Sequence, residues 1–125
     1  MAKILLIEDE APVREMLIDE LTVQGHKVVE AANGEEGLLK FLELEPDVVV
    51  CDRAMPGMSG YEVLERIRGA HPQFEDVPFI FLTALTDPRD KAAVEHLKPA
   101  AYIEKPVDFK ALGDKIKVLI QPVKK

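Results

Sequence analysis

Three carboxylates, one hydroxyl and one amine stand at the ends of short apolar runs in the sequence. The carboxylates belong to Glu8, Asp9 and Asp52, the hydroxyl to Thr83 and the amine to Lys105. Carboxylates gathered at one place repel one another unless a cation offsets their charge. Mg²⁺ prefers oxygen ligands and is commonly held by one or two carboxylates together with phosphate oxygens. The set therefore predicts a Mg²⁺ site that is open to a phosphate group.

The same residues could carry phosphoryl transfer. An aspartate carboxylate can attack phosphorus to form an aspartyl phosphate, and this transfer needs mainly positioning and neutralisation of charge. In this hypothesis the cation bridges Asp52 to one phosphoryl oxygen, Lys105 pairs with a second, and the Thr83 hydroxyl donates to the third. The three histidines of the chain stand apart from this set. We therefore expect the phosphoryl donor to be another protein or a small molecule.

Parallel strands that alternate with helices would bring these residues together. Segments of helical periodicity separate five short β-branched and aliphatic runs, at Lys3–Ile7, Lys27–Glu30, Asp47–Cys51, Phe79–Thr83 and Ala101–Glu104. The first, third and fourth runs are apolar almost throughout, which is typical of strands covered on both faces of a parallel sheet. The pattern predicts a three-layer α/β sandwich with its ligands at the carboxyl ends of the strands.

Helix signals fill the intervals between these strands. The expected helices lie between Pro12 and Gly25, at about Glu35–Leu44, from about Gly60 onward, at about Pro88–His96 and at Asp108–Ile120. Asp108 is expected to cap the last helix, because its side chain can accept a hydrogen bond from the first turn.

Length and composition set the class of protein. The chain has 125 residues, of which 47% are hydrophobic, and this is enough for one domain spanning residues 1–125. A net charge of -7 argues against direct electrostatic binding to nucleic acid. The apolar runs are far shorter than the roughly twenty residues that cross a bilayer. With one cysteine and no leader pattern, we expect a cytoplasmic protein that binds other proteins.

Four motifs in the expected order resemble one known family across essentially the whole chain. They are Leu6-Ile7-Glu8-Asp9-Glu10, Asp52-Arg53-Ala54-Met55-Pro56-Gly57-Met58-Ser59-Gly60, Thr83-Ala84 and Tyr102-Ile103-Glu104-Lys105-Pro106. The family is the receiver domain of two-component response regulators, which includes the bacterial chemotaxis regulator. The resemblance implies a flavodoxin-like (βα)5 sandwich whose five-stranded parallel sheet has the order 2-1-3-4-5.

The resemblance also implies a role for individual residues. Asp52 matches the phosphoacceptor, Lys105 the family's invariant lysine, Thr83 the switch hydroxyl and Tyr102 the switch aromatic. The implied peptide bond between Lys105 and Pro106 is cis, a geometry that costs little before proline.

The implied Mg²⁺ ligands are Glu8, Asp9, Asp52 and the backbone carbonyl of Ala54. Glu8 stands where many relatives have Asp, and its longer side chain leads us to expect that it acts through water while Asp9 binds directly. Ala54 and Leu85 stand where relatives often have polar groups that influence the attacking water. Our hypothesis is therefore a persistent phosphoryl group.

The implied function is signal transduction in a phosphorelay. A sensor histidine kinase or a histidine phosphotransfer protein would donate the phosphoryl group and dock largely through the first helix, whose exposed face would include Arg14, Glu15 and Ile18. Phosphorylation would remodel the surface of the fourth helix, fifth strand and fifth helix, so that it binds a downstream protein. The chain would be no enzyme beyond assisting its own phosphorylation and dephosphorylation.

Other readings remain open. A docking module of this fold that is never phosphorylated would typically lack the acidic pair, the acceptor or the lysine. A phosphohydrolase of aspartyl-phosphate type would usually have a second aspartate two positions after the nucleophile, where this chain has Ala54. A flavin carrier of similar topology would need a phosphate-binding loop after the first strand. This chain has the acidic run Glu8-Asp9-Glu10 there, which would repel a phosphate. The sequence leaves open whether the receiver works alone or within a longer regulator or hybrid kinase.

Overall fold

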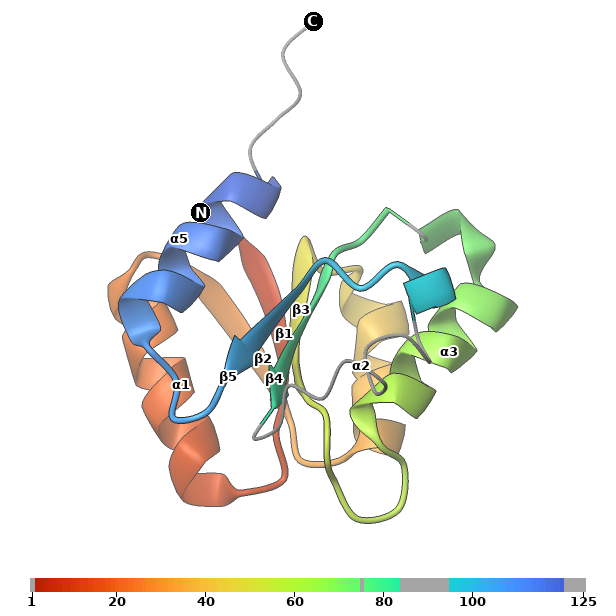
Figure 1. Ribbon diagram of the computed structural model, residues 1–125, viewed down its shortest axis with the longest axis horizontal. Helices are drawn as coiled ribbons and strands as arrows, with labels where there is room; N and C mark the ends of the chain where they lie inside the picture. Colours follow the sequence, from red (N-terminus) through yellow and green to blue (C-terminus); the bar gives the residue numbers. More distant parts are fainter. Residues whose placement is uncertain (1, 75, 84–94, 121–125) are drawn as a thin grey trace, which may run out of the picture.

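Five parallel strands form a single sheet. The computed structural model describes residues 2–74, 76–83 and 95–120. Within them the strand order is β2-β1-β3-β4-β5 (Figure 1), which confirms the order that the resemblance implied. The strands are β1 (Lys3–Ile7), β2 (Lys27–Ala31), β3 (Val48–Asp52), β4 (Phe79–Thr83) and β5 (Ala101–Glu104).

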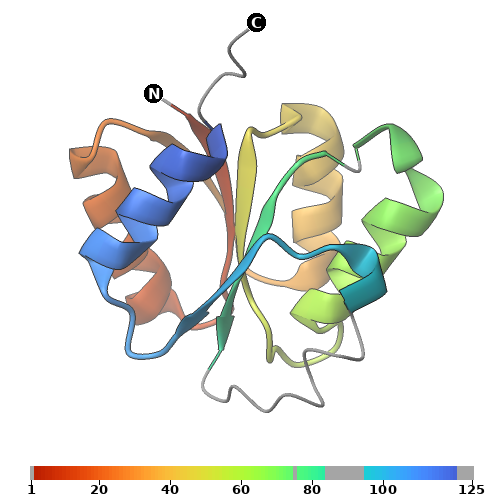
Figure 2. The ribbon, with the colours of Figure 1, turned by 45° about the horizontal axis from the view of Figure 1, so that its top comes forward.

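Helices cover both faces of this sheet. In Figures 1 and 2, α1 and α5 lie on one side and α2 and α3 on the other. The helices are α1 (Ala11–Val23), α2 (Gly34–Leu44), α3 (Gly60–Ala70) and α5 (Phe109–Ile120), with short 3₁₀ turns η1 (Pro72–Phe74) and η2 (Glu95–Leu97). The helix expected at 88–96 falls largely outside the described residues, and its last two positions belong to η2. In the described residues, no helix has the length and apolar character that crossing a bilayer requires.

Local capping explains where the helices begin. Asn33 accepts a hydrogen bond from the N–H of Glu36 at 2.8 Å, and Ser59 forms a reciprocal capping box with Glu62. These interactions satisfy N–H groups that a helix terminus leaves without partners. The expected cap of α5 is confirmed, because Asp108 accepts from the N–H groups of two residues in its first turn, at 3.0 and 3.1 Å.

The sheet separates two apolar cores. Alternate residues of the central strands point to opposite faces, so that Leu5, Ile7, Phe79 and Phe81 pack toward α2 and α3. Their neighbours, such as Ile4 and Leu82, pack toward α1 and α5. All positions of β3 and β4 are buried, as expected for strands that are covered on both faces. This rigid double core fixes the carboxyl ends of the strands relative to one another.

One arginine ties together the amino ends of β4 and β5. The guanidinium of Arg68, on α3, lies over the ring of Phe79 at 5.5 Å from its centroid. It also donates hydrogen bonds to the backbone carbonyls of Leu97 (2.9 Å), Phe74 (3.0 Å) and Val77 (3.1 Å). The connections that precede β4 and β5 are therefore both fastened to α3 by a single side chain.

Candidate functional site

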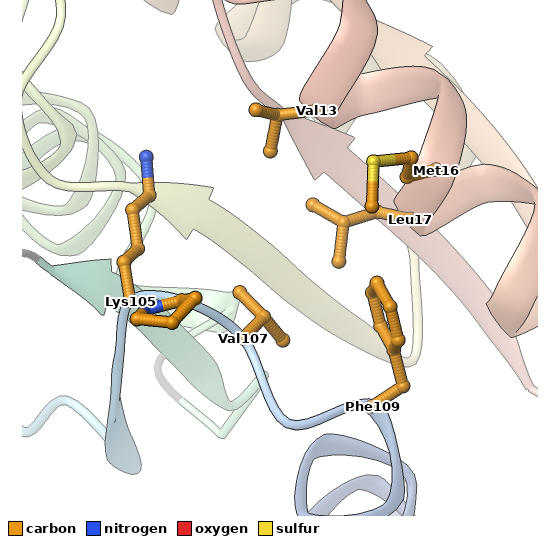
Figure 3. A pocket seen from close by; sticks show the side chains of 7 residues that line it. Val13, Met16, Leu17, Lys105, Val107 and Phe109 are labelled. Carbon is orange, nitrogen blue, oxygen red and sulfur yellow. The ribbon is translucent and has the colours of Figure 1, made fainter.

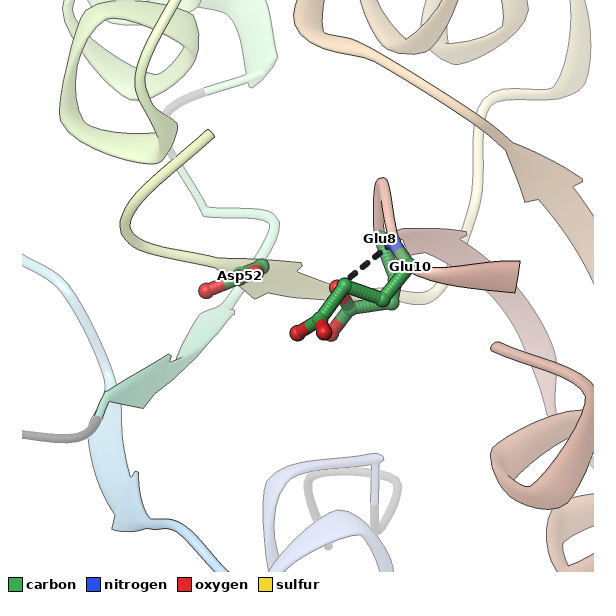
Figure 4. A group of neighbouring side chains, drawn as sticks. All are labelled: Glu8, Glu10 and Asp52. Carbon is green, nitrogen blue, oxygen red and sulfur yellow. Dashed lines mark hydrogen bonds between the residues drawn. The ribbon is translucent and has the colours of Figure 1, made fainter. Parts of the chain in front are cut away.

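Three carboxylates meet at the carboxyl edge of the sheet. Glu8 and Glu10 follow β1, Asp52 ends β3, and one oxygen from each lies within 4.8 Å of the others. Figure 4 shows the Glu8 and Glu10 carboxylates together, with Asp52 at the end of its strand beside them. Glu8 is 0% exposed and Asp52 4% exposed, whereas Glu10 is exposed. Pairing of β1 with β3 brings the two buried carboxylates together.

Lys105 supplies the positive charge of this cluster. Its Nζ lies 3.2 Å from Asp52 Oδ2, 3.4 Å from Glu8 Oε1 and 3.9 Å from Glu10 Oε1. Its backbone N–H donates to the carbonyl of Thr83 at 2.8 Å, and the expected cis bond to Pro106 is present. Desolvation lowers the pKa of Lys105, but the charges of Asp52 and Glu8 outweigh it and raise that pKa. Lys105 is therefore held as a cation against the carboxylates.

Glu8 is difficult to ionise where it lies. Burial, followed by a hydrogen bond with Asp52, raises the pKa of its carboxyl from 4.5 to about 7. A hydrogen bond from the Glu10 N–H at 3.2 Å and the charge of Lys105 act in the opposite direction. The site therefore favours a further positive charge whenever all three carboxylates are ionised. The donors are carboxylate oxygens and the cluster opens to solvent at Glu10, which fits Mg²⁺.

The structure differs from the expected ligand set at one position. The acidic group found among the described residues contains Glu10 and does not contain Asp9, which is half-buried. Direct binding by Asp9 therefore stays a prediction, as does the indirect role expected for Glu8. The sequence offered one signal for Glu10, its place in the acidic run after β1. The structure adds that the Glu10 N–H donates a hydrogen bond to Glu8 Oε2, which closes a tight turn after β1.

The loop after β3 orients the Asp52 carboxylate. The N–H of Ala54 donates to Asp52 Oδ1 at 3.2 Å, while Lys105 holds Oδ2. Gly60, the first residue of α3, donates its N–H to the carbonyl of Arg53 at 2.8 Å. A Cβ atom at Gly60 would collide with the carbonyl oxygen of Asp52. Only a glycine lets α3 begin this close to the acceptor backbone. The Ala54 carbonyl stays a predicted Mg²⁺ ligand.

The two expected switch residues lie on neighbouring strands. Thr83 ends β4, is 2% exposed and follows Leu82, the residue that pairs with Asp52. Tyr102 lies on β5 opposite Phe81, and their rings are 6.1 Å apart. The structure thus brings Thr83 to the acceptor and Tyr102 to the adjoining strand, while their switching roles stay predictions. Leu85 lies outside the described residues.

An apolar pocket adjoins the acidic cluster. It has a volume of about 190 Å³ and lies between α1 and the segment after β5, lined by Val13, Met16, Leu17, Lys105, Pro106, Val107 and Phe109 (Figure 3). The aliphatic part of Lys105 forms one wall, so the pocket and the cluster share a side chain.

Arg14 was expected on the exposed face of α1, and this expectation is wrong. Its side chain donates to the carbonyl of Glu8 at 2.8 Å and to Glu30 at 3.0 Å, and it is 16% exposed. Met16, which lines the pocket, is 56% exposed. The accessible apolar surface of α1 beside the site is therefore centred on Met16.

Comparisons with known proteins agree on one family. The sequence model described as response regulator receiver domain matches residues 4–117. A probable transcriptional regulator, ycf27 of Porphyridium aerugineum, is 40% identical over 123 residues, which make up 98% of this chain and 50% of that protein. The transcriptional regulatory protein AfsQ1 of Streptomyces coelicolor is 38% identical over 121 residues, which are 97% of this chain and 52% of that protein.

Among solved structures, the chemotaxis protein CheY4 of Vibrio cholerae superposes with a TM-score of 0.89 and 29% sequence identity, covering 95% of this chain and 98% of that chain. The chain spans about half the length of the curated relatives named above. Their similarity therefore concerns one part of each relative.

Proposed function

The chain belongs to the family of response regulator receiver domains of two-component systems, and from this premise we propose that Asp52 accepts a phosphoryl group in a Mg²⁺-dependent reaction. The observation that carries the proposal is the buried Asp52 carboxylate, with Lys105 Nζ at 3.2 Å and the carboxylates of Glu8 and Glu10 beside it. A buried acid held between a cation and an acidic metal-binding group is suited to nucleophilic attack on a phosphoryl group.

The chain's own residues would act as follows. An oxygen of Asp52 forms a bond to phosphorus while the bond from phosphorus to an imidazole nitrogen of the donor breaks, and that nitrogen keeps the electron pair. Lys105 pairs with one phosphoryl oxygen, and the Thr83 hydroxyl donates to another. Mg²⁺, bound by carboxylates of the cluster with Asp9 and the Ala54 carbonyl as further candidates, would neutralise charge on the phosphoryl oxygens.

We propose that the donor is a phosphohistidine of a sensor histidine kinase or a histidine phosphotransfer protein. The apolar pocket beside Lys105 supports this proposal, because a protein surface seated over Met16 and Phe109 would place a phosphohistidine close to Asp52. Substituting Met16 with Glu should then slow transfer from such a partner while leaving phosphorylation by a small donor unchanged.

For the output, we propose that phosphorylation moves Thr83 and reorients Tyr102, so that the surface around β5 and α5 changes. The relatives are named transcriptional regulators. The corresponding proposal is that this surface acts on a DNA-binding domain, in the same protein or in a separate one, and not on DNA directly. We also propose that the chain assists its own phosphorylation and dephosphorylation and is no enzyme toward other substrates.

The first experiment is intact mass spectrometry after incubation with acetyl phosphate, with and without Mg²⁺. The wild-type protein should gain one phosphoryl group only with Mg²⁺, and Asp52→Ala should gain none. Asp19→Ala is a matched control, because Asp19 is an exposed aspartate on α1. If the folded wild-type protein gains no mass under either condition, the proposal fails and a docking module that is never phosphorylated becomes the better explanation.

A further inference from the structure

Arg14 contacts both ends of the acidic run that follows β1. Its guanidinium Nη1 donates to the backbone carbonyl of Glu8 at 2.8 Å. Its own backbone N–H donates to the carbonyl of Glu10 at 2.9 Å, which closes the first turn of α1. Residues 8–10 are therefore tied to α1 through one residue, by its side chain at one end and by its backbone at the other.

The side chain of Arg14 is itself held from β2, the edge strand. Its Nε donates to Glu30 Oε1 at 3.0 Å. Glu30 follows Val28 by two residues on β2, and Val28 packs in the core on the α1 side, so both side chains point to that face of the sheet. One guanidinium therefore binds two acceptors from different parts of the chain. Arginine suits this position because its planar fork presents several donors in fixed directions, whereas lysine offers a single ammonium group.

The contact reaches the acidic cluster through the Glu8 carbonyl. The peptide unit between Glu8 and Asp9 is planar, so a bond that holds its oxygen also fixes the direction in which the chain continues toward Glu10. The Glu8 N–H is held separately, by the carbonyl of Ala31 at 3.1 Å. Both backbone polar groups of Glu8 are therefore bonded, and this restrains the direction of its buried carboxylate.

We propose that Arg14 is a positioning residue for the Mg²⁺ site: its guanidinium, anchored by Glu30, holds the Glu8 carbonyl so that the carboxylates after β1 converge on the ion. The inference rests on the proposed function, because Mg²⁺ binding at this cluster is part of that function. Groups that orient metal ligands typically contribute about 10- to 100-fold to metal affinity, so loss of the guanidinium should weaken Mg²⁺ binding by about tenfold.

The sign of this effect separates positioning from simple electrostatics. The Arg14 guanidinium is positively charged and therefore repels a cation bound nearby. If its charge alone mattered, removing it would leave the Mg²⁺ affinity unchanged or raise it. Positioning predicts the opposite result, because the affinity for a cation falls when a positive charge is removed.

Isothermal titration calorimetry with MgCl₂, without phosphodonor, measures the dissociation constant. Arg14→Gln should raise it by about tenfold, and Arg14→Lys, which keeps the charge and loses the fork, should raise it less. Lys40→Gln is the matched control, because Lys40 also binds Glu30, through the backbone carbonyl at 2.6 Å, and the substitution removes the same charge. This control should leave the dissociation constant unchanged.

The Mg²⁺ dependence of the mass gain from acetyl phosphate supplies a second readout. In Arg14→Gln, the Mg²⁺ concentration that gives half the maximal rate should rise together with the dissociation constant. The rate at saturating Mg²⁺ should approach that of the wild-type protein. A merely structural role would lower the free energy of unfolding, measured with urea in EDTA, without producing this division between affinity and maximal rate.

Two results would overturn the assignment. One is a folded Arg14→Gln variant that binds Mg²⁺ as tightly as wild type or more tightly. The other is a rate that stays low at saturating Mg²⁺, which would place Arg14 in the transfer step. If Arg14→Gln does not fold, Arg14→Lys and Glu30→Ala decide, since Glu30 is 52% exposed and its truncation should be tolerated; wild-type affinity in both contradicts the proposal. Absence of Mg²⁺ binding and of a mass gain in the wild-type protein contradicts the proposed function instead.

Discussion

Glu8→Gln should stabilise the metal-free protein at alkaline pH. Glu8 is 0% exposed, and burial with the hydrogen bond to Asp52 raises the pKa of its carboxyl to about 7, from 4.5 in an ordinary environment. Between these two values the folded state binds more protons than the unfolded state. The free energy of unfolding contributed by this group therefore falls as pH rises through that window.

The size of the effect follows from the two pKa values. One pKa unit corresponds to about 1.36 kcal/mol, so ionising Glu8 in the folded protein costs about 3 kcal/mol by pH 8. A glutamine keeps the shape of the side chain and stays neutral, so the variant avoids this loss. Below pH 4.5 both side chains are neutral in the folded and unfolded states. The two proteins should then have similar stability.

Urea unfolding at pH 4, 6 and 8 in the presence of EDTA measures the difference. Glu10→Gln is the matched control, because it removes the same charge from the same cluster at a side chain that is 62% exposed. Mg²⁺ should stabilise the wild-type protein more at pH 8 than at pH 5, since a ligand that binds the folded state adds RT ln(1 + [L]/Kd). A Glu8→Gln variant whose stability declines with pH as steeply as that of wild type would refute the reasoning.

Three further predictions follow from positions around the acceptor. Gly60→Ala should destabilise the protein by about 1–3 kcal/mol in urea unfolding, because the new methyl group meets the Asp52 carbonyl. The control Gly69→Ala lies in open space on the same helix and should stabilise the protein by up to about 1 kcal/mol. Equal effects of the two substitutions would contradict the packing argument. Ala54→Asn should shorten the lifetime of the phosphorylated protein, followed by mass spectrometry over time, whereas rapid hydrolysis in the wild type would count against a persistent phosphoryl group. Tyr102→Ala should keep the mass gain on Asp52 and weaken output; loss of that gain would contradict its assignment as a switch residue.

The strands could be predicted closely from the sequence because their signal is local. Three of the five predicted ranges, including Phe79–Thr83, coincide with the observed strands; β2 ends one residue later than predicted, and β3 is shifted by one residue at both ends. Continuous apolar runs bounded by polar residues mark the approximate ends of a doubly covered strand. Gly60 was also expected at the start of a helix, but its reason, the close approach to the Asp52 carbonyl, depends on the packing of α3 against β3.

Site residues at the ends of strands could be placed from the sequence, whereas the conformations of the Glu10 and Arg14 side chains could not. Asp52 and Lys105 meet because their strands share one sheet edge, and this follows from topology. The approach of the Glu10 carboxylate to the cluster accompanies a backbone bond from the Glu10 N–H to Glu8 and the proximity of Lys105, and the spacing of residues encodes neither. Arg14 likewise does not lie on the exposed face where it was expected, because its side chain donates a hydrogen bond to the Glu8 carbonyl. Such side-chain conformations depend on where the fold places their partners, and some partners, such as Lys105 beside Glu10, come from distant parts of the chain.

The bonds of Arg68 give the sheet two ends of different character. At the amino ends of β4 and β5, one guanidinium donates to three backbone carbonyls, which would otherwise need water molecules as hydrogen-bond donors. At the carboxyl ends, strong opposing charges meet around Lys105. A change of charge at the carboxyl ends of the strands should therefore leave the amino ends of β4 and β5 in place, because Arg68 holds them. Amide hydrogen exchange should accordingly be equally slow at Phe79 in the phosphorylated and unphosphorylated protein.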